Sequence, residues 1–446
     1  MLPRIMRRRF AGRPALPKTV RNMAWLSADS VIRMALGVVV GAWMARYLGV
    51  DQYGQFNYAL SFVALITPIA AAGLNGITVR EIIRSPDSAD QIIGTSFAIQ
   101  IVAAATTLLL ALIAITVVRP HDDLAKALVL ILSLAMFFRS TDTIKYWFES
   151  RVEAKYVVLV ENSALFISAA GRIGLMLAGA SLIWFAVIVM VEAIIVSTGL
   201  LLTYRRMGGD FGRWRMSLEQ ARWLLSESWP QLVSSLAVIV YMRIDQLMLG
   251  EMLGNAAVGI FSAAVRISEI WYFIPVAIVS SLFPALLEAK KTDEALYLSK
   301  LQHLHDVMAL LGVSVAILVT FSANWIIWLL FGPQYHESAT VLAIHTWGAV
   351  FVFLSLASGR WFLAENLQIY AVYRTLCGVV VNIALNLYCI PRYGPIGAAF
   401  ATLFSQAASC MFFNIVNRRT RPVFTMQMRA LFANRLVLDL ARQARR

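Results

Sequence analysis

The chain has 446 residues, of which 59% are hydrophobic and 14% are charged, with a formal net charge of +14 and a mean hydropathy of +0.70. An average soluble domain carries about 25% charged residues, so this composition excludes an ordinary soluble domain. A large soluble helical protein would also need polar outer helix faces, which this sequence lacks. We therefore expect a membrane protein.

Apolar segments of 20 or more residues follow one another along the whole chain. Each is long enough to cross a bilayer core of about 30 Å as a helix. We expect twelve spans, in chain order: residues 22–47, 55–80, 91–118, 124–147, 156–178, 182–204, 229–250, 256–286, 305–331, 338–362, 369–390 and 395–416. The predicted fold class is an all-α polytopic membrane protein with two six-helix bundles.

The predicted domains follow from these spans: a basic N-terminal segment at 1–21, a first bundle at 22–204, a linker at 205–228, a second bundle at 229–417 and a basic tail at 418–446. We expect the tail to form a basic amphipathic helix on the inner leaflet. The basic N-terminal stretch runs directly into the first span without a small-residue cleavage site, so we expect no signal peptide.

Basic residues predict the orientation of the chain. Seven Lys or Arg lie in residues 1–21, five Arg in the linker and eight Arg after Asn417, whereas the opposite side has only Arg119, Lys126 and Arg392 near its surface. The positive-inside rule therefore places both termini in the cytoplasm. Because these cations flank hydrophobic spans, we attribute them to topology and to anionic membrane lipids and expect no nucleic-acid partner.

A short motif occurs twice. Leu48-Gly49, Gly54 and Phe56 recur at an offset of 205 residues as Leu253-Gly254, Gly259 and Phe261, near the start of each half. Internal repeats of this kind are typical of transporters, in which substrate binds between two similar halves. Six spans per half is an even number, so we expect parallel repeats related by a pseudo-two-fold axis along the membrane normal.

Five arginines fall inside predicted spans, namely Arg33, Arg139, Arg172, Arg243 and Arg266. On the insertion scale a centrally placed arginine costs roughly 2.5–3.5 kcal/mol, so these side chains are expected to face protein, counter-ions or a water-filled cavity. Acidic residues stand close by in sequence: Asp29 four before Arg33, Asp142 three after Arg139, Glu269 three after Arg266 and Asp245 two after Arg243.

Two interpretations of these charges stay open. Spacings of three or four place both groups on one helix face, so the pairs can simply neutralise one another. Alternatively, several arginines line an internal cavity and bind an anionic substrate, because a guanidinium donates two parallel hydrogen bonds to a phosphate. The prolines Pro68, Pro275 and Pro284 interrupt the second span of each half, either as a hinge or as a static bend.

Several kinds of chemistry lack their sequence signals. There is no Walker A or dinucleotide fingerprint, and Cys377, Cys389 and Cys410 fall inside spans without metal-ligand spacing. His345 stands alone in the tenth span, and no long external loop is present to carry catalytic groups. We therefore expect no enzyme and no cofactor, with transport driven by an ion gradient or by the membrane potential.

Five stretches carry a family resemblance. YMRIDQLMLG at 241–250, VGIFSAAVRI at 258–267 and LFPAL at 282–286 resemble the seventh and eighth helices of bacterial polysaccharide flippases, and RYLGVDQYGQF at 46–56 and YGPIGAAFAT at 393–402 also resemble that family. The resemblance covers essentially the whole chain. It implies the multidrug/oligosaccharidyl-lipid/polysaccharide exporter superfamily and its MATE-like fold.

The resemblance also implies a function. Members of its O-antigen branch move undecaprenyl-pyrophosphate-linked oligosaccharides from the cytoplasmic to the periplasmic leaflet of the bacterial inner membrane. Basic residues on helices one, two, seven and eight attract the pyrophosphate there, which favours Arg33, Arg243 and Arg266 over Arg139 and Arg172. The pathway is O-antigen, capsule or exopolysaccharide synthesis, with a glycan polymerase and a chain-length regulator as further partners.

A related lipid II flippase group binds sodium through a carboxylate on helix seven, polar residues one turn apart on helix eleven and a threonine on helix twelve. This chain offers Asp245, Asn382, Asn386 and Thr402 at the matching positions, with Asn386 where that group has a second carboxylate. The resemblance thus implies ion coupling by Na⁺ or H⁺, and Asn382 and Asn386 can alternatively bond neighbouring helices.

Other functions are less consistent with the sequence. A multidrug or metabolite exporter of the same superfamily would favour a carboxylate-dominated cavity, whereas arginines are in excess here. A membrane glycan polymerase would need the external loop that is missing. A purely structural membrane protein would leave the repeat and the buried charges unexplained.

Overall fold

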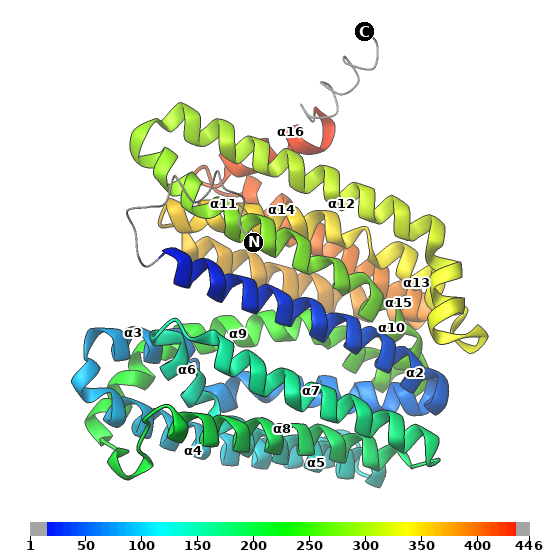
Figure 1. Ribbon diagram of the computed structural model, residues 1–446. Coiled ribbons are helices and arrows are strands. Elements are labelled where there is room, and N and C mark those ends of the chain that lie inside the picture. The colour runs from blue at the N-terminus through cyan, green and yellow to red at the C-terminus, as the bar shows by residue number, and fades with distance from the viewer. Residues whose placement is uncertain (1–15, 434–446) are drawn as a thin grey trace. The chain divides into compact units, whose positions relative to one another are not determined.

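The computed structural model describes the backbone of residues 16–433 and the side chains of residues 32–433, and helices make up most of this part of the chain (Figure 1). In a bilayer a helix satisfies its backbone hydrogen bonds internally, which explains why these apolar segments become long helices. The long elements are α2 (Leu16–Ala71), α4 (Ala89–Val118), α5 (Asp123–Arg139), α7 (Ala154–Leu177), α8 (Leu182–Arg206), α9 (Leu218–Leu253), α12 (Glu294–Phe331), α14 (Gly348–Ala364) and α15 (Gln368–Cys410).

Shorter helices connect or extend them: α3 (Asn75–Arg84), α6 (Thr143–Ser150), α10 (Asn255–Glu269), α11 (Phe273–Thr292), α13 (Glu337–His345) and α16 (Arg421–Phe432), with 3-10 turns that include η2 (Ser140–Asp142), η4 (Ile270–Tyr272) and η5 (Pro333–Tyr335). Pro68 lies inside α2 and Pro284 inside α11. At the start of the basic tail, α16 packs on α12 and buries Val423, Gln427 and Ala430, and the predicted position of the tail on the inner leaflet stays a prediction. The predicted tail beyond residue 433 lies outside the described residues.

Ten helical segments of the described chain are long and apolar enough to cross a membrane. The expected number of twelve is not confirmed. Two of the ten segments, Ile32–Arg84 and Gln368–Ile415, each include residues of two predicted spans and a glycine with non-helical dihedral angles, Gly49 and Gly394. The protein is therefore an all-α, multi-pass membrane protein whose helices bend sharply where the sequence predicts two of its short loops.

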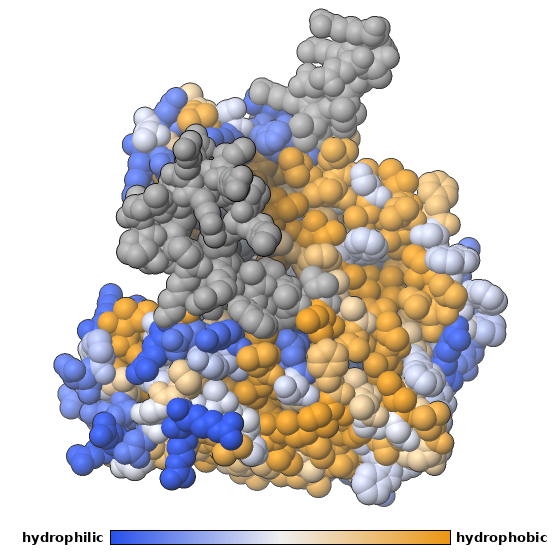
Figure 2. All heavy atoms as spheres, in the orientation of Figure 1, coloured by the Kyte–Doolittle hydropathy of each residue, from blue (hydrophilic) through white to orange (hydrophobic). Residues whose placement is uncertain are grey.

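Exposed side chains on these helices are largely hydrophobic. Figure 2 shows hydrophobic residues over much of the visible face and hydrophilic residues gathered toward helix ends. On α12, Phe321 has 87% of its surface exposed, and Leu318, Trp325 and Trp328 are exposed beside it. Such a contiguous apolar surface would be unstable in water and fits contact with lipid.

The chain forms two compact units. Unit 1 contains the chain up to Val40 and Ile66–Leu236; unit 2 contains Gly41–Leu65 and the chain from Ala237 onward. The unit boundary therefore passes through α2 twice and through α9 once. The bundles predicted at 22–204 and 229–417 follow chain order alone, and that division remains a prediction.

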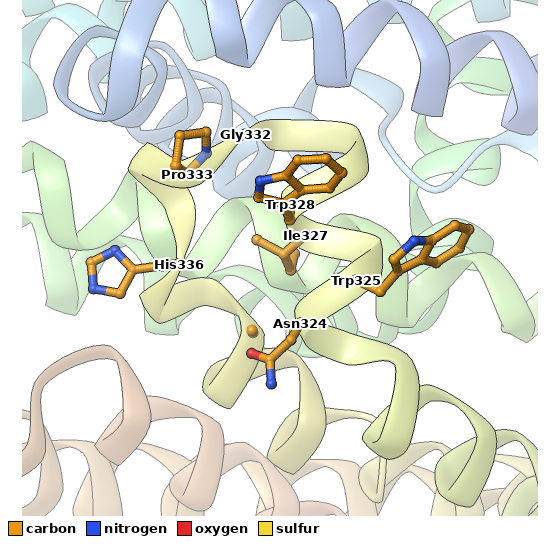
Figure 3. Close-up of a pocket in the computed structure, with 8 residues that line it drawn as sticks. Asn324, Trp325, Ile327, Trp328, Gly332, Pro333 and His336 are labelled. Atoms are coloured by element: carbon orange, nitrogen blue, oxygen red, sulfur yellow. The ribbon is translucent and has the colours of Figure 1, made fainter.

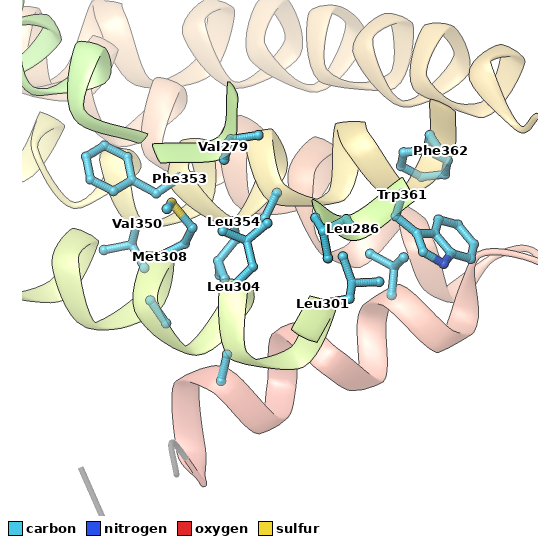
Figure 4. Packing of buried hydrophobic residues seen from close by; sticks show 14 of the residues in the cluster. Val279, Leu286, Leu301, Leu304, Met308, Val350, Phe353, Leu354, Trp361 and Phe362 are labelled. Carbon is cyan, nitrogen blue, oxygen red and sulfur yellow. The ribbon is translucent and has the colours of Figure 1, made fainter. Parts of the chain in front are cut away.

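Within unit 1, α8 packs on α5 and α7, and α4 packs on α5. Within unit 2, α12 packs on α11, α13, α14 and α16. Figure 4 shows the core of unit 2, where Met308 and Leu304 of α12 meet Phe353 and Leu354 of α14.

The two copies of the repeated motif pack against each other inside unit 2. Gly49 and Gly254 share one backbone conformation, with φ of 75° and 88° and ψ of 173° and −178°, which a residue with a Cβ rarely adopts. A Cβ on Gly54 would lie 1.8 Å from the carbonyl oxygen of Asn255. At the equivalent place in the second copy, a Cβ on Gly259 would lie 2.1 Å from the carbonyl oxygen of Val50. The two contacts are therefore equivalent: the 205-residue offset that relates the two motifs in sequence also relates the residues they contact.

Candidate functional site

The predicted ion-coupling residues come together in the interior of unit 2. Asp245 of α9 is 3% exposed, and its carboxylate accepts hydrogen bonds from Thr402 Oγ1 at 2.6 Å and Asn386 Nδ2 at 2.5 Å. Asn386 Nδ2 also donates to Asn382 Oδ1 at 3.0 Å. The four residues, which the family resemblance grouped, thus form one network between α9 and α15, and their role in ion coupling stays a prediction.

Among the described residues, no lysine or arginine lies within ion-pair distance of Asp245. Buried carboxylates are normally paired, coordinated or protonated, because an isolated charge is costly in a low-dielectric interior. Asn386 Oδ1 is also buried without a hydrogen-bond partner. Carboxylate, amide and hydroxyl oxygens are ligands suited to a hard cation, and a carboxyl group with these neighbours can equally hold a proton. The described residues contain no cluster of three or more His, Cys, Asp or Glu side chains that would hold a metal.

A second charged group in unit 2 involves two of the predicted pyrophosphate-binding arginines. Arg243 Nη2 of α9 lies 3.6 Å from Glu269 Oε2 of α10. The sequence spacing predicted that Glu269 pairs with Arg266 on the same helix. The observed ion pair instead joins Glu269 to Arg243 on a different helix. Arg266 Nη1 instead donates to the Tyr53 hydroxyl at 3.3 Å. No carboxylate of the described chain lies within ion-pair distance of Arg266.

The remaining predicted arginines lie in unit 1 and have carboxylate partners. Arg33 Nη2 donates to Glu161 Oε2 at 3.2 Å, and Lys145 Nζ donates to the other oxygen of Glu161 at 2.5 Å. Lys145 also pairs with Asp142 at 2.8 Å, and Asp142 lies 3.8 Å from Arg139 Nε. The Arg139–Asp142 pair predicted from the sequence is therefore present. The side chain of Asp29, the predicted partner of Arg33, lies outside the described residues.

Arg172 forms a separate pair in unit 1. Its Nη2 donates to Glu192 Oε2 at 3.1 Å, and Ser168 donates to the same oxygen at 2.6 Å. Sequence reasoning overlooked Glu161 and Glu192. Each is the only carboxylate of its predicted span, so the same cost argument that identified the arginines would have found them.

Two further arginines of unit 2 were also missed. Arg360 lies over the Phe283 ring at 4.9 Å and donates to Ser280 at 3.4 Å, whereas Arg374 lies over the Phe362 ring at 5.2 Å. Both stand near ends of predicted spans, where an arginine can extend its charged group toward the membrane surface at low cost, so the cost argument did not identify them. His345, which stands alone in the tenth predicted span, is buried with its Nδ1 2.6 Å from Ser268 Oγ.

A pocket of about 390 Å³ lies elsewhere in unit 2, at the end of α12. Figure 3 shows Asn324, Trp325 and Trp328 of α12 and Pro333 and His336 beyond it. None of the predicted site residues lines it. Exposed tryptophans are also common where helices leave the hydrocarbon region, so this pocket does not define a function by itself.

The fold and these sites are those of a multi-pass membrane transporter with charged groups inside its helical units. The chain belongs to the polysaccharide biosynthesis protein family, whose sequence profile matches residues 19–290. A second profile, MatE, matches residues 230–388. These matches place the chain in the multidrug/oligosaccharidyl-lipid/polysaccharide exporter superfamily, as the sequence motifs indicate.

Two curated relatives come from Haloferax volcanii. The "Probable flippase AglR" is 24% identical over 426 residues, which is 88% of this chain and 82% of that protein. The "Probable low-salt glycan biosynthesis flippase Agl15" is 26% identical over 194 residues, which is 43% of this chain and 41% of that protein, so this match spans less than half of the relative.

Solved structures show the same fold at low sequence identity. The lipid II flippase MurJ in an inward closed conformation has a TM-score of 0.70 at 14% identity, covering 92% of each chain. An inward-facing MATE-family multidrug resistance transporter has a TM-score of 0.71 at 15% identity, covering 90% of this chain and 98% of that one. The MATE-like fold expected from the resemblance is therefore confirmed.

Proposed function

We propose that this protein is a flippase that moves an undecaprenyl-pyrophosphate-linked oligosaccharide from the cytoplasmic to the periplasmic leaflet by alternating access. Family membership and the flippase relatives support glycan transport. The main observation in favour of an anionic head group concerns Arg266. Its guanidinium lies inside a membrane span, and its described partner is a phenol rather than a carboxylate. Five N–H donors on one guanidinium can serve both that phenol and a phosphate oxygen.

In this proposal the three arginines have unequal roles. Arg266 binds the diphosphate directly. Arg243 and Arg33 are held by Glu269 and Glu161, so each must exchange or share its carboxylate partner to bind the substrate. The sugars occupy the polar interior of the protein, and the polyprenyl tail stays in lipid. O-antigen, capsule or exopolysaccharide synthesis would use such a step, followed by a glycan polymerase and a chain-length regulator.

We propose that the Asp245 network couples transport to a cation. Asp245, Asn382, Asn386 and Thr402 supply the oxygens that would hold Na⁺, and Asp245 alone would carry a proton. Either event changes the charge of a buried carboxylate and so shifts the balance between two conformations. The membrane potential would add to the driving force for the same cation.

The proposed orientation places both termini in the cytoplasm of a bacterium and the chain in its inner membrane. Reporter fusions after residues 206 and 364 test this placement, because both positions are expected on the cytoplasmic side and fusions after 119 and 179 on the other. We propose transport rather than catalysis as the whole activity.

The function is tested by transport in proteoliposomes that contain an undecaprenyl-pyrophosphate oligosaccharide. Its appearance in the opposite leaflet is measured by glycosidase digestion from one side. Flipping that depends on the protein and fails for the undecaprenyl monophosphate analogue supports the assignment. If the protein transports a cationic drug and does not transport the lipid, the multidrug exporter is the better assignment.

A further inference from the structure

The 205-residue offset of the repeat also relates Gly41 to Gln246 and Ser61 to Arg266. In unit 2 these four residues make two equivalent contacts: Ser61 Oγ donates to Gln246 Oε1, and Arg266 lies against Gly41. In one contact a small serine faces glutamine; in the other a large arginine faces glycine. The two contacts are therefore at equivalent positions of the repeat, but the small and the large side chain have changed places between them.

Gly41 leaves the space that the guanidinium occupies. A Cβ at Gly41 would lie 2.3 Å from Arg266 Cζ and 2.6 Å from both Nε and Nη2. Gly41 itself lies within the helical part of α2, so helix geometry does not require a glycine there. The atoms that a Cβ would meet belong to the mobile end of a side chain, so an added methyl group displaces the guanidinium more readily than the backbone.

Tyr53 fixes the other side of the guanidinium. The Tyr53 ring is fully buried and meets the Tyr335 ring edge-on, with centroids 6.0 Å apart and planes at 87°. The Tyr335 hydroxyl in turn donates to the carbonyl oxygen of Ala45 at 2.9 Å, one helical turn beyond Gly41. Tyr53 therefore has a defined position from which its hydroxyl accepts the hydrogen bond of Arg266 Nη1.

We infer that Gly41 and Tyr53 are positioning residues that fix the direction of the Arg266 guanidinium for a diphosphate. This inference rests on the proposed function of Arg266. Gly41 allows the guanidinium to lie flat on α2, and Tyr53 occupies one N–H with a neutral acceptor. Tyr53 thus holds the guanidinium without placing a negative charge on it, which a carboxylate at position 53 would not achieve.

The experiment measures binding of undecaprenyl diphosphate to the purified full-length protein in lipid nanodiscs. Undecaprenol, which lacks the diphosphate, serves as the control ligand. The variants are Arg266→Ala, Gly41→Ala, Tyr53→Phe and the double variants Gly41→Ala/Arg266→Ala and Tyr53→Phe/Arg266→Ala. Gly359→Ala is the matched control, because this glycine of α14 has no atom within 4 Å of an added Cβ.

We expect Arg266→Ala, Gly41→Ala and Tyr53→Phe each to raise the Kd for undecaprenyl diphosphate, by roughly tenfold for the first two and about threefold for the third. Undecaprenol binding and the melting temperature should stay close to those of Gly359→Ala. Each double variant should bind no more weakly than Arg266→Ala alone, because positioning has no effect once the guanidinium is gone. A merely structural role would instead give additive losses and lower the affinity for both lipids.

The outcomes separate the two proposals. If Arg266→Ala leaves the diphosphate affinity unchanged, Arg266 does not bind the head group and the proposed site is wrong. If Arg266→Ala weakens binding but Gly41→Ala and Tyr53→Phe do not, the site stands and the positioning inference is overturned. Should Gly41→Ala fail to fold, Tyr53→Phe and its double variant decide the question alone.

Discussion

The two units handle buried charge differently. In unit 1, Arg33, Arg139 and Arg172 all have carboxylate partners, and Glu161 joins two cations in a continuous chain of ion pairs. Unit 2 also contains such pairs, for example Arg243 with Glu269. It differs in that the Asp245 carboxylate accepts hydrogen bonds only from hydroxyl and amide groups, and the Arg266 guanidinium lies against a glycine and donates to a phenol. Ion pairs of the first kind hold helices together, whereas a charge with neutral neighbours keeps its capacity to bind an ion. The comparison indicates that residue type in a span does not distinguish a structural charge from a functional one, but its partner does.

The largest effect is expected at Glu161, where a substitution tests whether the ion pairs of unit 1 are structural. Replacing Glu161 with Gln removes the carboxylate that serves both Arg33 and Lys145 and leaves two cations close together. We expect the free energy of unfolding to fall by about 2–3 kcal/mol. This is at or below the low end of the cost of breaking a fully buried ion pair, because the Glu161 side chain is 21% exposed. Thermal melting in detergent measures it against Glu337→Gln, a change at an exposed glutamate. Equal melting of the two variants would show that the chain of ion pairs is not structural.

The matched arginine pair sharpens the same contrast. Arg266→Ala should reduce transport of the diphosphate lipid at least tenfold, about 1.4 kcal/mol, and leave the melting temperature nearly unchanged. Arg172→Ala should do the opposite, since it leaves Glu192 with only Ser168 as a donor among the partners described above. Transport in proteoliposomes and melting are measured on both proteins. If Arg172→Ala reduces transport and Arg266→Ala reduces stability, the roles assigned to these two arginines are wrong.

Asp245→Asn tests the carboxylate of unit 2. The amide has the same shape but cannot bind Na⁺ or a proton as a carboxylate does, so we expect transport to lose its dependence on the ion gradient. Imposing a Na⁺ gradient and a pH gradient separately identifies the cation. Thr402→Val removes one hydroxyl and should weaken coupling less. An Asp245→Asn protein that still follows either gradient would place coupling elsewhere.

The smallest effect is expected at Arg139. Its side chain is 61% exposed and its nitrogen lies 3.8 Å from Asp142, which is a long and solvent-accessible pair. Such pairs contribute roughly 0–1 kcal/mol, so Arg139→Ala should melt within a few degrees of the wild type and transport normally. A large loss of stability there would mean that exposed and buried pairs in unit 1 cannot be treated separately.

Much of the architecture could be predicted from the sequence. The apolar segments predicted an all-α polytopic protein, and the family resemblance grouped Asp245 with Asn382 and Asn386, which do share one hydrogen-bond network. Pairing within a helix was less reliable. Arg139–Asp142 formed as expected, whereas Glu269 paired with Arg243 from another helix rather than with Arg266. A spacing of three places two side chains on one face, but a closer partner on a neighbouring helix competes for the same carboxylate.

The sequence by itself determined that this protein crosses a membrane, because uninterrupted apolar segments have no other stable environment, and that its glycines recur at a fixed offset. Tertiary structure decided which charges are neutralised, since Glu161 and Arg33 are 128 residues apart and meet only through packing. It also decided that Gly41 faces Arg266 and that Tyr53 fixes it. Contacts between distant residues depend on how helices pack in three dimensions, and no local pattern of residues specifies that packing.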